Sequence, residues 1–297
     1  RRRCYGIQSA TRYLSTAQPY EREQGAEHLG APWSTLEQLQ EQAKDAESKS
    51  LIPYGRKVYS QNEEDGIIQE IFRRIGTTNQ RFVEFGVGHG VDNSTLALLF
   101  GGWQGLWIEG STDACNDIKN QLPSVLGSRQ LSLINSFITK DNINGLIAAA
   151  MPPGSIDLLS VDIDGNDFAV FDAISHVQAR VIVIEYNAKF APPIEYCMAY
   201  KEDHEWQGDD CFGASLQYLE NGFATKGYAL VSCNLTGTNA FFVQQSLLGD
   251  LFQSPFTAQH HYQPARYELS GFPNGHRPSL RTLEGSIRSP MGAQLNQ

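Results

Sequence analysis

The stretch Phe82-Val83-Glu84-Phe85-Gly86-Val87-Gly88-His89-Gly90 decides the fold of this chain. Its first four residues form a short apolar run typical of a buried strand, and the alternating glycines that follow favour a tight turn. Leu96, Leu98 and Phe100 then give a pattern that predicts a helix. A glycine turn between a strand and a helix is often a plain connection, but its backbone amides can also hold a ligand.

The same alternation of apolar runs and helical patterns continues along the chain. Further strands are predicted at 105–108, 131–134, 156–161 and 181–184, with a helix around residues 168–174. Strands that alternate with helices indicate a doubly wound, Rossmann-like α/β fold with a mostly parallel sheet. Two last apolar runs, 228–232 and 240–243, flank a turn-forming segment and predict an antiparallel hairpin at the C-terminal end of the sheet.

Two capping-box patterns predict helices before the first strand. Ser34 with Glu37 predicts a helix that ends near Ser50, and Ser60 with Glu63 predicts a second helix that ends at Gly76. A further helical pattern runs from Ala214 to about Leu219.

We divide the chain into three parts. Residues 1–58 form an N-terminal arm and helix, in which 1–33 are polar and without a sustained period. Residues 59–245 form the main domain, and 188–213 are an insertion rich in aromatic side chains. Residues 246–297 form a C-terminal extension, which we expect to be extended or only partly ordered.

Composition excludes several classes of partner. The 297 residues carry 23 Lys and Arg against 33 Asp and Glu, a net charge of -10, which disfavours nucleic acid and anionic membranes. No apolar run approaches the ~20 residues of a transmembrane helix. The five cysteines are scattered without C-x-x-C spacing, so we expect reduced thiols, a cytoplasmic setting and no zinc site.

Glu109 follows the second predicted strand, 19 residues after Gly90. A carboxylate at this point can accept hydrogen bonds from both hydroxyls of a ribose, which suits NAD and S-adenosylmethionine equally. Glu84 distinguishes between the two cofactors, because a carboxylate in the strand before the turn would repel the pyrophosphate of NAD. A sulfonium cofactor with an amino group would tolerate it.

A second polar group follows the fourth and fifth strands. Asp162 and Asp164 end the fourth strand, and Glu185 and Asn187 end the fifth. The carboxyl ends of adjacent strands meet at one edge of the sheet, and these oxygens are the ligands that Mg²⁺ or Mn²⁺ prefers. In the alternative, Asp164 and Asn166 cap the next helix, and Asp162 holds a substrate amine without metal.

Six motifs in this order resemble the FkbM-like methyltransferases, within the class I S-adenosylmethionine-dependent fold. The resemblance covers roughly residues 59–244. The motifs are Ser60 to Gly66, Phe82 to Gly90, Trp107 to Gly110, Asp162 to Asp167, Ile184 to Asn187, and Gly237 to Val243.

The resemblance implies S-adenosylmethionine as the cofactor. Glu84 and the two glycines after it would hold its amino acid half, and Glu109 its ribose. Asn135 or Ser136 would lie beside the adenine. The full set of implied cofactor-binding residues is Gln61, Glu84, Gly86, Gly88, Asn93, Glu109, Ser136 and Asp162.

Relatives of this kind methylate hydroxyls, often on sugars or polyketides, so the resemblance implies a small-molecule or saccharide acceptor. The chain differs from commoner members at His89, at Val91-Asp92 and in the insertion, where we assign acceptor binding to Lys189, Tyr196 and Trp206.

Removal of the hydroxyl proton needs a base or a metal, and we assign catalysis to Asp162, Glu185 and His89, with His204 as a further candidate base. The proposed metal ligands are Asp162, Asp164, Glu185 and Asn187.

Two other classes of protein fit the sequence less well. A nicotinamide-dependent oxidoreductase would pair a Tyr and a Lys four residues apart on a helix, but Tyr196 and Lys201 are five apart in an irregular stretch. A non-catalytic binding module would have lost the glycines or the carboxylates at the strand ends, and this chain keeps them. The sequence favours an O-methyltransferase and leaves its oligomeric state open.

Overall fold

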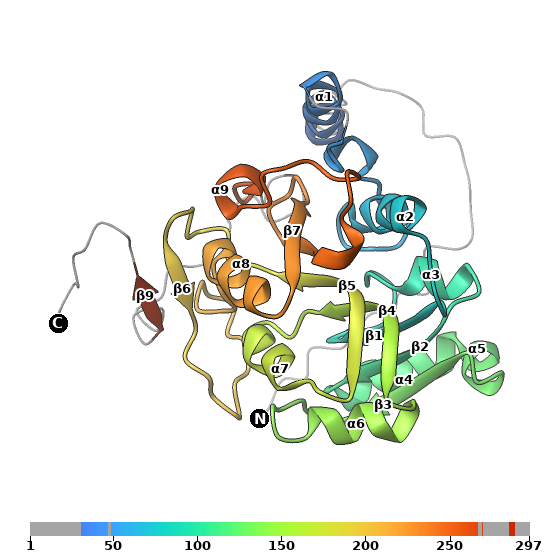
Figure 1. Ribbon diagram of the computed structural model, residues 1–297. Helices are drawn as coiled ribbons and strands as arrows, with labels where there is room; N and C mark the ends of the chain where they lie inside the picture. The colour runs from blue at the N-terminus through green and yellow to red at the C-terminus, as the bar shows by residue number, and fades with distance from the viewer. Residues whose placement is uncertain (1–30, 47–48, 267–268, 270–284, 289–297) are drawn as a thin grey trace, which may run out of the picture.

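The computed structural model describes residues 31–46, 49–266, 269 and 285–288. Seven strands in the described part form one mixed sheet in the order β3-β2-β1-β4-β5-β8-β7 (Figure 1). β1 to β5 are parallel, whereas β8 runs antiparallel to both β5 and β7. The strands are β1 (Arg81–Phe85), β2 (Gln104–Glu109), β3 (Leu131–Asn135), β4 (Gly154–Val161), β5 (Val177–Glu185), β7 (Tyr228–Cys233) and β8 (Asn239–Gln244).

Helices connect the strands and cover both faces of the sheet. None of the helices in the described residues is long and apolar enough to cross a membrane. The helices of the main domain are α2 (Glu64–Ile75), α3 (Leu96–Phe100), α4 (Thr112–Gln121), α5 (Pro123–Gly127), α6 (Ile143–Ala150), α7 (Asp167–Ala173) and α8 (Leu216–Thr225).

Alternation along the strands builds two cores. Val83 and Phe85 of β1 pack with apolar residues of α6, α7 and α8 on one face. Phe82 points to the other face, together with Trp107 of β2 and apolar residues of α2, α3 and α4. Because successive strand residues point to opposite faces, each buried strand contributes apolar side chains to both cores.

This arrangement confirms the predicted doubly wound, Rossmann-like sheet with an antiparallel C-terminal hairpin. The chain runs outward from β1 through β2 to β3 and then returns to place β4 beside β1. The strand order reverses between β1 and β4, and ligands of open α/β sheets bind at such a point, outside the carboxyl ends of the strands.

Both predicted capping boxes were wrong. The first described helix, α1 (Ala31–Ala46), begins before Ser34, so that residue lies inside it. α2 begins at Glu64, not after Ser60. Asp65 explains the difference, because its carboxylate accepts the amides of Val58, Tyr59 and Ser60 at 2.7–2.8 Å and fixes the approach to the helix from within its first turn.

Other boundaries also differ from the prediction. α8 extends to Thr225, six residues past the expected end, and α4, α5 and α6 occupy segments in which no helix was predicted. The extension after residue 245 contains a short helix, α9 (Ala258–His261), and β9 (Ser286–Arg288). β9 pairs with β6 (Glu195–Cys197) of the insertion. The expectation for residues 1–30 lies outside the described residues.

Candidate cofactor and active site

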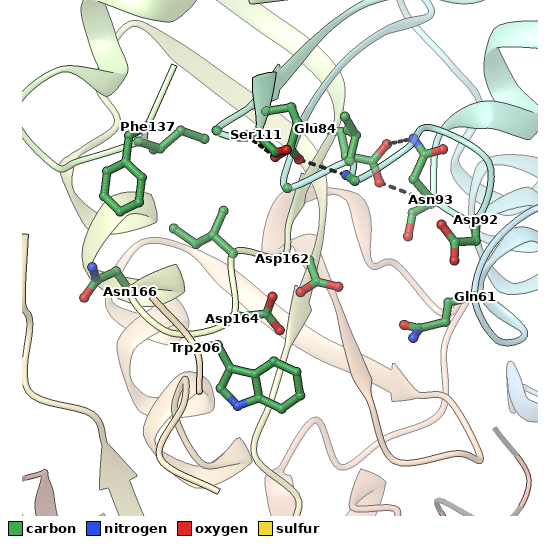
Figure 2. Close-up of a pocket in the computed structure, with 18 of the residues that line it drawn as sticks. Gln61, Glu84, Asp92, Asn93, Ser111, Phe137, Asp162, Asp164, Asn166 and Trp206 are labelled. Carbon is green, nitrogen blue, oxygen red and sulfur yellow. Dashed lines mark hydrogen bonds between the residues drawn. The ribbon is translucent and has the colours of Figure 1, made fainter. Parts of the chain in front are cut away.

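A cavity of about 680 Å³ opens at the carboxyl ends of β1, β2 and β4, at the point where the strand order reverses (Figure 2). The glycine turn, the loop after β3, the turn after β4 and the insertion all contribute walls. The lining residues are Gln61, Glu64, Glu84, Gly86, Val87, Gly88, Asp92, Asn93, Ser94, Glu109, Gly110, Ser111, Phe137, Ile138, Asp162, Ile163, Asp164, Asn166, His204, Glu205, Trp206 and Asn239.

The glycine turn packs directly on the turn after β4. Gly86 has a φ of +68°, and a Cβ at this position would lie 1.7 Å from the carbonyl oxygen of Asp162. Gly88 has a φ of +53°, but a Cβ there would meet no atom within 4 Å. Gly86 is therefore required by close packing, whereas Gly88 faces open space at the cavity wall.

Glu109 ends β2 and closes the glycine turn. One carboxylate oxygen accepts the amide of Gly88 at 2.9 Å, and the other accepts the amide of Ser111 at 2.7 Å. The side chain is 9% exposed and lines the cavity. Each oxygen has a further lone pair, so the carboxylate can still accept hydroxyl donors from a ligand.

Glu84 holds the loop that follows the glycine turn. Its oxygens accept the amide of Ser94 at 2.8 Å, the side-chain amide of Asn93 at 2.6 Å and the hydroxyl of Thr95. Burial raises the pKa of Glu84, and these hydrogen bonds act against that rise. The carbonyl oxygen of the Asn93 side chain is buried without a partner, so it is a free acceptor at the cavity wall.

The start of α2 builds the wall beside the C-terminal hairpin. Glu64 is 1% exposed and accepts the side-chain amides of Asn234 at 2.7 Å and Asn239 at 2.9 Å. Its neighbour Glu63 accepts the amide of Thr236 at 3.1 Å. The acidic pair therefore joins two segments that lie about 170 residues apart in the sequence.

Asp162, Asp164 and Glu185 converge at the ends of β4 and β5. One oxygen from each carboxylate lies within 4.8 Å of the other two. One oxygen of Glu185 is buried without a hydrogen-bond partner. Burial, followed by repulsion from Asp162 and Asp164, raises the pKa of Glu185 well above its usual range, and burial does the same for Asp162. The trio has the donor atoms and spacing that a hard divalent cation needs.

A network of hydrogen bonds fixes the turn that carries two of these carboxylates. Asp167 accepts the amides of Ile163 and Gly165, both at 2.8 Å, and burial raises its pKa to about 6. The ring of His204 packs on Gly165, where a Cβ would lie 2.3 Å from the ring, and its Nε2 lies 3.1 Å from the carbonyl oxygen of Asp164. His204 therefore supports the turn.

The cavity is strongly acidic. No Lys or Arg is found among its lining residues in the part of the chain that the structure describes. Three of the lining carboxylates, Asp92, Asp164 and Glu205, are exposed at the surface. Seven carboxylates line it: Glu64, Glu84, Asp92, Glu109, Asp162, Asp164 and Glu205.

Most of the cofactor-binding residues predicted from the sequence line this one cavity, and so does Trp206 of the insertion. Figure 2 shows the ring of Trp206 and the carboxylate of Asp164 on the same side of it. Glu185 is not among the lining residues, but one of its carboxylate oxygens lies within 4.8 Å of oxygens of Asp162 and Asp164, which do line the cavity. The predicted site residues in the lining are Gln61, Glu84, Gly86, Gly88, Asn93, Glu109, Asp162, Asp164, His204 and Trp206.

Two predicted residues near the cavity require correction. His89 leaves the glycine turn toward solvent, with a side chain that is 62% exposed and a ring nitrogen 2.7 Å from Asp117, so the structure does not place it as a catalytic base. Ser136 bonds to the carbonyl oxygen of Phe137 and does not line the cavity. The ring next to it, Phe137, does.

Three more predicted residues serve the insertion itself. Asn187 is fully buried, and its side chain donates to the carbonyl oxygens of Asp210 and Phe212 and accepts the amide of Lys189, so the proposed metal set reduces to the acidic trio. The ammonium group of Lys189 pairs with Asp210. Tyr196 is fully buried and stacks on a phenylalanine of the insertion, with ring centroids 4.1 Å apart.

Other lining residues were missed in the sequence. Phe137 and Ile138 lie two and three residues after the end of β3, and their position close to a strand end could have indicated them. Asp92 and Ser94 lie in the loop that Glu84 holds, which only the hydrogen-bond geometry identifies.

Comparisons with known proteins give weak similarities. No protein-family model and no curated protein matches the chain. Among solved structures, the N-terminal domain of EvdMO1 with SAH bound is 14% identical with a TM-score of 0.40, over 69% of this chain and 94% of that chain. The O-methyltransferase from Bacillus cereus in complex with SAH is 15% identical with a TM-score of 0.41, over 71% and 88%. Similarity at this level does not identify a reaction, because one fold serves many functions.

Proposed function

We propose that this protein is an S-adenosylmethionine-dependent O-methyltransferase, with residues 59–245 as its catalytic domain. The supporting observation is the cavity at the strand reversal, in which Glu109 ends β2 beside the glycine turn and no Lys or Arg is present among the described lining residues. A cofactor with a sulfonium and an ammonium group carries positive charge into that field.

The same charge argues against a dinucleotide. A pyrophosphate placed at the glycine turn would meet the carboxylates of Glu84 and Glu109, with no described Lys or Arg in the lining to offset them. Bringing like charges together in a protein site costs several kcal/mol. The carboxylate field therefore favours the sulfonium cofactor over NAD.

We assign the parts of the cofactor along the cavity. The ribose hydroxyls donate to Glu109, whose oxygens keep free lone pairs. The α-ammonium group donates to the unpartnered oxygen of Asn93, and Gln61 lies at the same end of the cavity in Figure 2. The adenine lies against Phe137 at the other end, because a flat ring offers a stacking surface.

We assign the acceptor, a sugar or another small polyhydroxylated molecule, to the side of the cavity formed by Trp206 of the insertion. An exposed aromatic ring offers the C–H face of a sugar a rigid apolar surface. The residues available to orient the reacting hydroxyl are Asp162 and Glu185, at the ends of β4 and β5.

In the reaction, the hydroxyl oxygen attacks the sulfonium methyl, the carbon–sulfur bond breaks, and its electron pair returns to sulfur. When no cation is bound, we assign the released proton to Asp162, because burial raises its pKa and so makes the ionised carboxylate a stronger base. Asp162, Asp164 and Glu185 would hold Mg²⁺ or Mn²⁺, and the buried, unpartnered oxygen of Glu185 fits such an ion. A cation bound there would stabilise the developing alkoxide.

The first experiment compares ligands by calorimetry. We expect S-adenosylmethionine and S-adenosylhomocysteine to bind, and NAD and NADP not to bind. Tight binding of NAD in place of the sulfonium cofactor would overturn the proposal. Turnover is then measured as S-adenosylhomocysteine released in the presence of a panel of monosaccharides and polyols, and cofactor binding without any release would indicate a binding module.

A second experiment tests the metal. Mn²⁺ added to chelator-treated protein should bind, as detected by electron paramagnetic resonance, and Glu185→Gln should weaken that binding at least tenfold. Asp117→Asn is a matched control, because Asp117 is a half-exposed acid outside the cavity. Equal Mn²⁺ binding in Glu185→Gln and in the unaltered protein would exclude the trio as the site.

A further inference from the structure

The acceptor side of the cavity combines a fixed aromatic ring with carboxylates. The indole nitrogen of Trp206 donates to the carbonyl oxygen of Asp209 at 2.7 Å, which holds the ring in place. Glu205 precedes it, and both residues line the cavity together with Asp164. Trp206 is 37% exposed, so a ligand in the cavity can reach it.

The hydrogen-bonding balance of the cavity is one-sided. It supplies carboxylates and no described Lys or Arg. Two further acceptors are buried without a donor: the side-chain oxygen of Asn93, which is 8% exposed, and one oxygen of Glu185. Buried acceptors without partners are costly, and the cofactor's ammonium group and a cation would satisfy these two. The exposed carboxylates of Asp164 and Glu205, beside Trp206, then favour an acceptor that brings donors and positive charge.

We propose that the acceptor carries a protonated amine, as an amino sugar or an amine-bearing polyol does, and that the amine binds between the Trp206 ring and the carboxylates of Asp164 and Glu205. This inference rests on the proposed methyl transfer and specifies its substrate class. An ammonium group is attracted to the face of an indole ring, and the neighbouring carboxylates add Coulomb attraction. Sugar phosphates and uronic acids are excluded by the same charges.

The test follows the indole N–H signal of Trp206 by NMR in chelator-treated protein, with and without S-adenosylhomocysteine. The chain has four tryptophans, and Trp206→Phe identifies the signal. The probes are glucosamine, N-acetylglucosamine and glucose 6-phosphate. They share the sugar ring and differ in charge.

We expect glucosamine to shift the Trp206 signal with a Kd about tenfold lower than that of N-acetylglucosamine, and glucose 6-phosphate to produce no shift. Glu205→Gln should weaken glucosamine binding about three- to tenfold. Glu202→Gln should leave it unchanged, because Glu202 is exposed in the same loop and does not line the cavity.

Three outcomes would overturn the inference: no shift with glucosamine, equal binding of the acetylated or phosphorylated sugar, or an equal effect of the two Glu→Gln variants. The cofactor experiment is separate, because S-adenosylhomocysteine binding is measured by calorimetry without any sugar. If the cofactor fails to bind while glucosamine still shifts Trp206, the proposed methyl transfer is wrong and the charge selectivity stands.

Discussion

Glu109→Gln tests the cofactor site most directly. The carboxylate accepts the amides of Gly88 and Ser111, and we propose that it also accepts both ribose hydroxyls. A glutamine removes the charge and turns one acceptor into a donor that faces a backbone N–H. A hydrogen bond to a charged group contributes about 1.5–3 kcal/mol. We therefore expect a loss of about 2–4 kcal/mol, or roughly 30- to 1000-fold in Kd.

The assay is calorimetry with S-adenosylhomocysteine and with its 2′-deoxy analogue, on the unaltered protein and on Glu109→Gln. The two changes form a thermodynamic cycle, and the cycle isolates the contact between carboxylate and hydroxyl from general loosening of the turn. We expect the missing hydroxyl to weaken binding to the unaltered protein and to have little further effect in the variant. Asp117→Asn should bind both ligands as the unaltered protein does.

Additive losses would refute the reasoning. If removing the 2′ hydroxyl weakens binding equally in both proteins, Glu109 does not contact it. If Glu109→Gln leaves the affinity for S-adenosylhomocysteine unchanged while the protein stays folded, the cofactor lies elsewhere in the cavity.

Three further predictions concern stability, each measured by urea denaturation. Gly86→Ala should lower the free energy of unfolding by roughly 2–4 kcal/mol, because its Cβ would lie 1.7 Å from the carbonyl oxygen of Asp162. Gly88→Ala should lower it by only about 1 kcal/mol, because a Cβ there meets no atom within 4 Å and only the positive φ is unfavourable. Equal losses in the two variants would contradict this reasoning. Burial and repulsion from its acidic neighbour raise the pKa of Glu63 from 4.5 to about 7, so its contribution to stability is fully present below pH 4.5 and is lost as the pH rises through 7. At pH 8, the free energy of unfolding of Glu63→Gln should therefore exceed that of the unaltered protein by up to about 3 kcal/mol. A difference between the two proteins that stays constant from pH 4 to pH 8 would exclude this effect. Arg180 is buried, and its guanidinium lies 2.7 Å from the carboxylate of Asp157. Asp157→Asn leaves this guanidinium without its charge partner and should lower the free energy of unfolding by about 3–5 kcal/mol. A loss below about 1 kcal/mol would be incompatible with that pairing.

The sequence predicts secondary structure best where the hydrophobic period and the residue composition indicate the same element. The strands were predicted well because the central parallel strands are buried on both faces and are therefore mostly apolar: 181–184 is apolar throughout, and 156–161 is apolar except for Asp157 and Ser160. Helices such as α4 were missed because their apolar face is narrow: only Ala114, Cys115 and Ile118 are buried in its ten residues. Such a short stripe does not stand out from a polar loop.

The site could be predicted only as far as topology determines it. Strand ends meet at one edge, so Glu109 and Asp162 were found, but the direction of a loop side chain depends on contacts far away in the sequence. Asn187 follows β5 as a ligand would, yet it holds the backbone of residues 210 and 212. The aromatic residues of the insertion divide in the same way, because Tyr196 forms the interior of the insertion and Trp206 reaches the cavity.

Carboxylates around the cavity differ in whether their oxygens already accept hydrogen bonds from the protein. Glu64 and Glu84 are acidic and buried, but each accepts three or more hydrogen bonds from the chain itself, so burial is compensated and their role is to join segments. The trio of Asp162, Asp164 and Glu185 differs, because its carboxylates converge within 4.8 Å and one oxygen of Glu185 is buried without a hydrogen-bond partner.

Burial, followed by repulsion between the neighbouring carboxylates, raises the pKa values of Asp162 and Glu185, so that keeping these groups ionised in the folded protein costs free energy. A fold retains such an arrangement when a ligand offsets the cost. The trio is therefore where we propose that a cation or the reacting hydroxyl binds, whereas Glu64 and Glu84, which accept hydrogen bonds from the chain, join the segments around the cavity.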